Sequence, residues 1–266
     1  METTGDVTGY IDVAQIMIYL FWAFFAGLLL YIRREDKREG YPLVSERSDS
    51  IRVQGFPSMP PAKVFRFEDG SEYRAPGDSR DDRELIAEPT APWLGAPIEP
   101  IGDPLAAGVG PGSYAIRPET PETTAEGDPR LRPMRILDDF RVAEGSPDPR
   151  GMVLVGADET VVGRIVDLWI DLSESQLRYL EFELASSSVA ISDDAVSATR
   201  LVPIAICRVD ASARVVRTGA LLAEQFQGIP AVRASDRVTM MEEERITAYC
   251  GSGYLYATED RQEALV

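Results

Sequence analysis

Histidine is absent from this chain of 266 residues, and its absence limits the chemistry that the other residues can do. Without imidazole there is no Ser-His-Asp or Cys-His nucleophile, no HExxH metal site, and no His-ligated haem or copper centre. The two cysteines, Cys207 and Cys250, are far apart in the sequence, and two thiols without histidine do not complete a usual zinc site. The Gly-rich segment GVGPGS has neither the GxGxxG spacing nor the Lys-Ser/Thr pair of a P-loop. An enzyme is therefore the weakest interpretation of this sequence.

Carboxylates are the most abundant ionisable groups: 44 Asp and Glu stand against 27 Lys and Arg, and the formal net charge is −17. Such a surface repels nucleic-acid phosphates and anionic lipid headgroups, so we expect no nucleic acid as a partner. It also concentrates cations, including protons, although solubility explains most of these charges. Asp171 and Glu174, in WIDLSES, come directly after an apolar β-rich run. The residues alone favour a solvated turn here, because Asp and Ser are common in turns.

A single apolar run from Val13 to Ile32 holds about 20 residues without a charge, enough to cross the hydrocarbon of a bilayer. The leader 1–12 carries only acidic charges, whereas six Lys and Arg side chains lie within residues 33–52. A secretory signal would have its positive charges before a shorter apolar core. We therefore expect a transmembrane helix at 13–32 with the amino terminus outside, anchored at its ends by Tyr10 and Tyr31. A buried core helix is the less favoured alternative.

Most of the 19 prolines lie between Ser45 and Arg150, in phrases such as EPTAPWLGAPIEPIGDP. Proline fixes φ and removes a hydrogen-bond donor, so a long helix or a central strand is not expected there. Disorder is one interpretation. Because apolar and aromatic residues are interspersed among the prolines, the other is an extended segment that lies on a partner surface. Within it, VFRFEDGSEYRAP predicts a hairpin that turns at Asp69-Gly70.

After about Leu137 the sequence changes to short β-rich runs, which predict a small antiparallel barrel or sandwich. We expect a turn at 156–160, a short helical piece at LLAEQF, and a last helix in SDRVTMMEEERITAYCGSGYLYA. Gly251 and Gly253 should weaken the end of that helix. The expected organisation is a tail at 1–12, the membrane helix at 13–32, the extended segment at 33–136, a mainly-β domain with the terminal helix at 137–258, and a tail at 259–266.

Several phrases resemble one family, the H subunit of the purple-bacterial type photosynthetic reaction centre. FWAFFAGLLLYIRREDKREGYPL is similar to the family's membrane helix and the turn after it, with REGYPL the most specific element. GDPLAAGVGPGSYAIR resembles the family's GDP…GVGP segment, RPMR its following Pro-Met, and IVDLWIDLSESQLRYLEFEL its central barrel strands. GIPAV and VTMMEEERITAYCGSGYLYA resemble the region of its last helix. The resemblance runs in order from about residue 10 to residue 257.

The resemblance implies a single transmembrane α-helix plus a mainly-β cytoplasmic domain, a small antiparallel PRC-type barrel, with a Pro-rich extended segment and a C-terminal helix. It implies a non-enzymatic subunit that caps the L and M subunits on the cytoplasmic side and assists proton delivery to the secondary quinone. Bacteriochlorophyll, bacteriopheophytin, quinones and non-haem iron would belong to partner subunits, with none bound by this chain alone. A cytochrome subunit and a light-harvesting antenna are further expected members of the complex. The expected location is the bacterial inner, photosynthetic membrane.

The resemblance also implies residues for proton transfer. Glu174 and Asp171 fall on the family's DxxE pattern, and burial or like-charge neighbours can lift the pKa of such carboxylates toward neutrality. Aligned on the Pro-Met pair, Glu126 and Asp128 occupy positions where relatives carry proton-collecting histidines, and Glu122 lies upstream. A carboxylate with an ordinary pKa of about 4 is a poorer proton carrier at pH 7 than imidazole. Either these acids form the proton entrance, or they are ordinary surface charges and the entrance lies elsewhere.

Other residues are expected at contacts. Arg178, Tyr41 and Arg38 are expected at the subunit interface, and Tyr31 and Arg34 at lipid headgroups. In the acidic run 242–244, one or two side chains should cap the helix or pair with arginines, because consecutive helix positions face different ways. A second class of function is a single-pass, membrane-anchored adaptor whose PRC-barrel binds another cytoplasmic protein. Co-elution with bacteriochlorophyll in mild detergent would separate these two functions.

Overall fold

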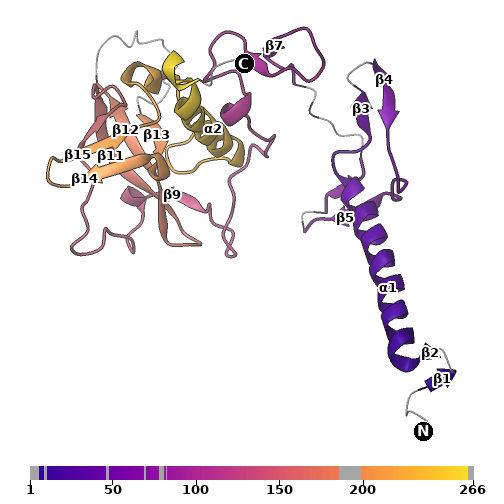
Figure 1. The fold of residues 1–266 in the computed structure, drawn as a ribbon. Helices are drawn as coiled ribbons and strands as arrows, with labels where there is room; N and C mark the ends of the chain where they lie inside the picture. Colours follow the sequence, from indigo (N-terminus) through magenta and orange to yellow (C-terminus); the bar gives the residue numbers. More distant parts are fainter. Residues whose placement is uncertain are drawn as a thin grey trace. The chain divides into compact units, whose positions relative to one another are not determined.

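The computed structural model describes residues 6–8, 11–45, 48–68, 70–77, 81, 83–185 and 199–262. The chain divides into two compact units, residues 1–82 and 83–266, which are treated separately below (Figure 1). Tyr10, Asp69 and the last four residues of the predicted tail lie outside the described residues. The predicted boundary between 33–136 and 137–258 stays a prediction.

The first unit contains the predicted apolar helix, α1 (Val13–Glu35), which is preceded by the short antiparallel strands β1 (Asp6–Thr8) and β2 (Ile11–Asp12). The Asp12 side chain caps the helix by accepting a hydrogen bond from the Gln15 backbone N–H at 2.6 Å. Gln15, the one strongly polar residue of the run, donates to the Tyr19 hydroxyl at 2.9 Å. The helix is long and apolar enough to cross a membrane. It extends three residues beyond the predicted end, because the positive charges of Arg33 and Arg34 in its last turn are favourable at the carboxyl end of a helix.

A buried lysine fixes the chain directly after α1. The residue is Lys37, in the 3₁₀ turn Asp36–Arg38, and only 1% of it is exposed. Its Nζ donates to the backbone carbonyls of Gln54 at 2.5 Å and Pro57 at 2.6 Å, and lies 5.1 Å from the centroid of the Tyr41 ring. The ammonium group thus satisfies its hydrogen bonds with main-chain oxygens, as a buried charge must.

Two hairpins follow in the first unit: β3 (Leu43–Ser45) pairs with β4 (Ser48–Val53), and β5 (Lys63–Arg66) pairs with β6 (Glu72–Ala75). The second confirms the hairpin that was predicted around Gly70, whose φ of +82° suits a tight turn. Arg38 donates to the carbonyls of Pro61 at 2.7 Å and Ala75 at 3.0 Å, and therefore ties this hairpin to the end of α1.

The second unit begins with extended chain. It contains the hairpin of β7 (Ala87–Pro89) and β8 (Ile98–Pro100), a 3₁₀ turn at Gly110–Gly112, β9 (Leu131–Pro133) and a 3₁₀ turn at Met134–Ile136. Within the described part of 83–136, the regular elements are all short, in agreement with the proline content. The segment has a defined path, because Gly112 packs closely on the last helix: a Cβ at this glycine would lie 2.9 Å from the Ser252 hydroxyl.

The centre of this unit is a seven-stranded sheet with the strand order β13-β12-β11-β10-β15-β14, in which β9 also pairs with β11 (Figure 1). Its strands are β10 (Val153–Val155), β11 (Val161–Asp171), β12 (Gln176–Leu184), β13 (Thr199–Pro203), β14 (Cys207–Asp210) and β15 (Val215–Thr218). The predicted mainly-β fold is confirmed. One pair departs from the antiparallel pattern, because β10 and β15 run parallel.

The helix α2 (Met240–Tyr256) packs on the sheet through contacts with β13 (Figure 1). The Thr239 hydroxyl and the Glu242 carboxylate form a capping box at its start, and Ile246 and Tyr249 are buried in the core. The helix continues through both glycines that were expected to weaken it. A Cβ at Gly253 would overlap the Ala220 carbonyl oxygen, so glycine permits this close approach. The predicted helical piece at LLAEQF is a 3₁₀ turn, Ala223–Gly228.

The core encloses two carboxylates, Asp167 on β11 and Glu181 on β12. Arg135, from the RPMR motif, pairs with both, at 3.0 Å from Asp167, and the Trp169 ring N–H donates to Glu181 at 3.0 Å. These bonds explain how charged residues are tolerated among apolar strands. They also connect the chain that follows β9 to the sheet.

Candidate functional site

Asp171 and Glu174 lie in the turn between β11 and β12. The Asp171 carboxylate accepts hydrogen bonds from the backbone N–H groups of Ser173 at 3.0 Å and Glu174 at 3.1 Å, and Ser175 has a φ of +52°. The sequence alone favoured a turn with Asp and Ser, and the turn is present. It is not fully solvated, however, because Asp171 is only 1% exposed.

Arg130 connects this turn to the chain that leads into β9. Its Nε lies 2.9 Å from both carboxylate oxygens of Asp171, and its Nη2 lies 2.7 Å from Asp171 Oδ2. The same guanidinium pairs with Glu174 at 3.1 Å and with Glu122 at 3.0 Å. Arg178, on β12, pairs with Asp171 at 3.2 Å and Glu174 at 2.7 Å. We call these five residues the Asp171 cluster.

The electrostatics of the cluster separate its two turn carboxylates. Burial alone would raise the pKa of Asp171, but hydrogen bonds from Arg130, the Glu174 backbone and Arg178, together with the positive charge of Arg130, outweigh burial and lower that pKa. Asp171 is therefore ionised at neutral pH. The Glu174 side chain is 47% exposed and is held between two guanidinium groups.

The three upstream acids do not all join the cluster. Glu122 does, through Arg130, and its side chain is 50% exposed. Glu126 and Asp128 are exposed on a tight turn closed by the hydrogen bond from the Thr124 backbone N–H to the Asp128 carbonyl at 2.8 Å. They line a surface cavity of about 460 Å³. Among the described residues, neither side chain forms an ion pair with the cluster.

The residues predicted at the subunit interface and at lipid headgroups lie in both units of the chain. Arg178 is half exposed within the Asp171 cluster, whereas Arg38 and Tyr41 make contacts within the first unit. Tyr31 and Arg34 are exposed on α1. Their contacts with partner subunits or lipid stay predictions.

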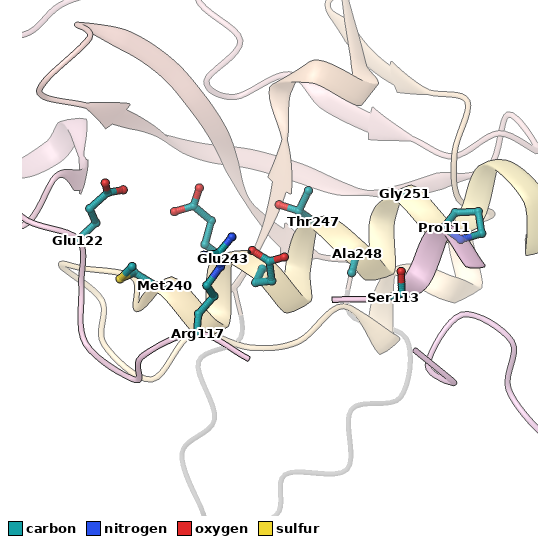
Figure 2. A pocket seen from close by; sticks show the side chains of 10 residues that line it. Pro111, Ser113, Arg117, Glu122, Met240, Glu243, Thr247, Ala248 and Gly251 are labelled. Carbon is teal, nitrogen blue, oxygen red and sulfur yellow. Dashed lines mark hydrogen bonds and ion pairs between the residues drawn. The ribbon is translucent and has the colours of Figure 1, made fainter. Parts of the chain in front are cut away.

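A pocket of about 600 Å³ lies between α2 and the extended segment that carries Glu122 (Figure 2). In the acidic run of α2, one acid caps the helix and another pairs with an arginine, as expected. Glu242 belongs to the capping box, and the Glu244 carboxylate accepts a hydrogen bond from the Arg117 guanidinium at 3.4 Å. Glu243 lines the pocket, and its carboxylate extends to the same side as that of Glu122 in Figure 2. Burial raises the pKa of Glu243, and the charge of Glu122 adds to the rise, against the opposing hydrogen bond with Tyr179.

Sequence reasoning missed Arg130, and it included Glu243 in the acidic run without placing it in this pocket. Arg130 stands 41 residues before Asp171, and only the pairing of β9 with β11 brings them together. The acidic run pointed to Glu243, but the sequence did not show which of its three acids faces this pocket, because that depends on the register of the helix. Within the described chain, no group of three or more Cys, Asp or Glu residues could hold a metal ion.

Comparison with protein families identifies both parts of this arrangement. Residues 5–136 match the model of the photosynthetic reaction centre H-chain N-terminal region, which includes α1, Glu122 and Arg130. Residues 142–222 match the PRC-barrel domain, which includes the Asp171–Arg178 turn. The chain belongs to the reaction-centre H-subunit family. Members of this family are structural, non-pigment subunits of the photosynthetic reaction centre. The apolar helix α1 of this chain fits a single-pass membrane anchor.

Proposed function

We propose that this H subunit caps the cytoplasmic side of the L and M subunits and assists proton delivery to the secondary quinone. The observation that carries the proposal is the Asp171 cluster, a connected set of carboxylates and guanidinium groups that includes both buried and exposed members. Reduction of a quinone to a quinol takes up two protons. A buried quinone therefore needs ionisable groups or waters that lead to bulk solvent.

Glu174 and Asp171 take different roles in this proposal. Asp171 remains ionised, because its hydrogen bonds lower its pKa, and it positions Arg130 and Arg178. Glu174 is the carboxylate that accepts and releases a proton, since its side chain is 47% exposed and can exchange protons with water. The two guanidinium groups hold its oxygens in place, with the closest contact 2.7 Å from Arg178.

The test is Glu174→Gln in the whole reaction centre, with the rate of the second electron transfer to quinone measured after two flashes as a function of pH. We expect a slowing of about 100-fold, the lower end of what a positioned proton donor contributes. Glu183→Gln is the matched control, because Glu183 is an exposed acid at the far end of the same strand, β12. An unchanged rate in the Glu174 variant would exclude its relay role.

The topology follows from the same proposal. The basic last turn of α1, with Arg33 and Arg34, favours the cytoplasmic side of the photosynthetic membrane, and the amino terminus then lies in the periplasm. Purification in mild detergent tests the assembly. The H subunit should co-elute with the near-infrared absorbance of bacteriochlorophyll, whereas an adaptor for another cytoplasmic protein would elute without it.

A further inference from the structure

The proton entrance is the open question in a chain without histidine, and the α2 pocket offers a route that the sequence did not indicate. The pocket, of about 600 Å³, is large enough for several waters, and its walls combine apolar residues with polar ones. Arg117 and Glu122 line it from the extended segment, and Glu243, Glu244 and Thr247 line it from α2 (Figure 2). Water in such a pocket would have the several polar partners that it needs.

Glu243 is a half-buried acid of this pocket. Its carboxylate is hydrogen-bonded to the Tyr179 hydroxyl, which lies 3.2 Å from the Thr247 hydroxyl oxygen. Within the described chain, Glu243 makes no ion pair. Its charged surroundings are Glu122 on the extended segment, Arg130 near β9 and Arg178 on β12, in addition to Arg117 and Glu244 at the pocket wall.

Glu122 joins the pocket to the Asp171 cluster. It lines the pocket and also lies 3.0 Å from Arg130, which in turn contacts Asp171 and Glu174. Glu122 therefore belongs to both the pocket wall and the Asp171 cluster.

The turn with Glu126 and Asp128 lacks such a connection. Both acids are exposed, and their cavity is lined by Ser173 of the DxxE turn in addition to the apolar Phe140 and Leu172. Among the described residues, neither acid forms an ion pair with a member of the Asp171 cluster, whereas Glu122 of the α2 pocket pairs with Arg130.

We propose that protons enter through the α2 pocket, where Glu243 takes a proton from water and passes it by way of Glu122 and pocket water to Glu174. Each step breaks one O–H bond and forms another, so Glu243 returns to its carboxylate form after every transfer. The inference rests on the proposed function of Glu174 as a relay. It assigns Glu243 the role of proton acceptor at the entrance.

The experiment measures flash-induced proton uptake and the second electron transfer in the whole reaction centre, from pH 6 to pH 9. We expect Glu243→Gln to slow both about 100-fold at pH 8, the lower end of the effect of a positioned proton donor. A small weak acid added to the buffer should restore the rate, because it can carry protons through the pocket. A purely structural role of Glu243 would not allow such rescue. Glu183→Gln is again the control.

Three comparisons decide the outcome. The inference is overturned when Glu174→Gln slows the reaction and Glu243→Gln does not, and the proposed function then stands without it. It is also overturned when the double variant Glu126→Gln, Asp128→Asn slows proton uptake instead. A wild-type rate in both Glu174→Gln and Glu243→Gln contradicts the proposed function itself. Should Glu243→Gln not assemble, Glu122→Gln is the second variant, because the Glu122 side chain is 50% exposed. A wild-type rate in that variant also overturns the entrance.

Discussion

Replacing Arg130 with methionine tests whether the Asp171 cluster holds the second unit together. Methionine keeps an apolar stem of similar length but removes all hydrogen bonds to Asp171, Glu122 and Glu174. Asp171 would stay buried, at 1% exposure, with only Arg178 and two backbone N–H groups as partners. Removing one partner of a buried ion pair costs about 3–5 kcal/mol. Because Asp171 keeps these other donors, we expect the lower end, about 3 kcal/mol.

The control is Arg217→Met. Arg217 pairs with Glu159, whose side chain is 71% exposed, and with Asp210, whose side chain is 39% exposed. Exposed ion pairs contribute about 0–1 kcal/mol, so this variant should lose less than about 1 kcal/mol. Both substitutions remove one arginine from the same unit. The comparison therefore isolates the effect of burial at Asp171.

The assay is thermal unfolding of the full H subunit in detergent, followed by near-ultraviolet circular dichroism. For a unit of this size, about 3 kcal/mol lowers Tm by roughly 6–12 °C. A double-mutant cycle with Asp171→Asn should give a coupling energy of about 2 kcal/mol, since the two residues share one interaction. Equal losses in Arg130→Met and Arg217→Met, or a coupling energy near zero, would refute this account of the cluster.

Two further predictions concern the same sheet. Hydrogen bonds lower the pKa of Asp171, so its contribution to stability is complete above the unfolded pKa of about 3.9 and is lost as pH falls through the folded pKa. The difference in unfolding free energy between the wild type and Asp171→Asn, measured by guanidinium titration, should therefore shrink below about pH 4. A difference that grows below about pH 4 would contradict the lowered pKa. A Cβ at Gly163 would overlap the Glu183 carbonyl oxygen on the paired strand, so Gly163→Ala should lower the unfolding free energy by more than about 2 kcal/mol in the same titration. In the control Gly219→Ala, the new Cβ would have no atom within 4 Å, and the unfolding free energy should change by less than about 0.5 kcal/mol. Equal effects of the two substitutions would show that β12 shifts to accommodate the Cβ at little cost.

The elements of the fold that depend on local pattern were predictable. The apolar helix follows from an uninterrupted run of uncharged residues, and the hairpin of β5 and β6 follows from its turn residues. The parallel pairing of β10 and β15 was not predictable, because these strands are distant in the sequence and the local pattern of each carries no information on its partner. Parallel strands need a long connection, and here that connection contains four other strands of the same sheet.

The candidate site was predictable only in part, for a similar reason. The DxxE turn was visible because Asp171 and Glu174 are close in the sequence and resemble a family pattern. Which of them stays ionised depends on Arg130, and that contact exists only after β9 has paired with β11. The raised pKa of Glu243 likewise arises from its burial in the folded unit, which outweighs its hydrogen bond with Tyr179 and which no local pattern describes. Charge environments are tertiary properties, and sequence spacing alone does not determine them.

Lys37 has a consequence for how the first unit tolerates sequence change. Its ammonium group binds the main-chain oxygens of Gln54 and Pro57, and every residue type supplies such an oxygen. Position 54 can therefore vary as long as the backbone keeps its path, whereas the lysine itself is replaceable only by a group of equal reach and charge. A saturation scan should show an intolerant position at Lys37 and a permissive one at Gln54.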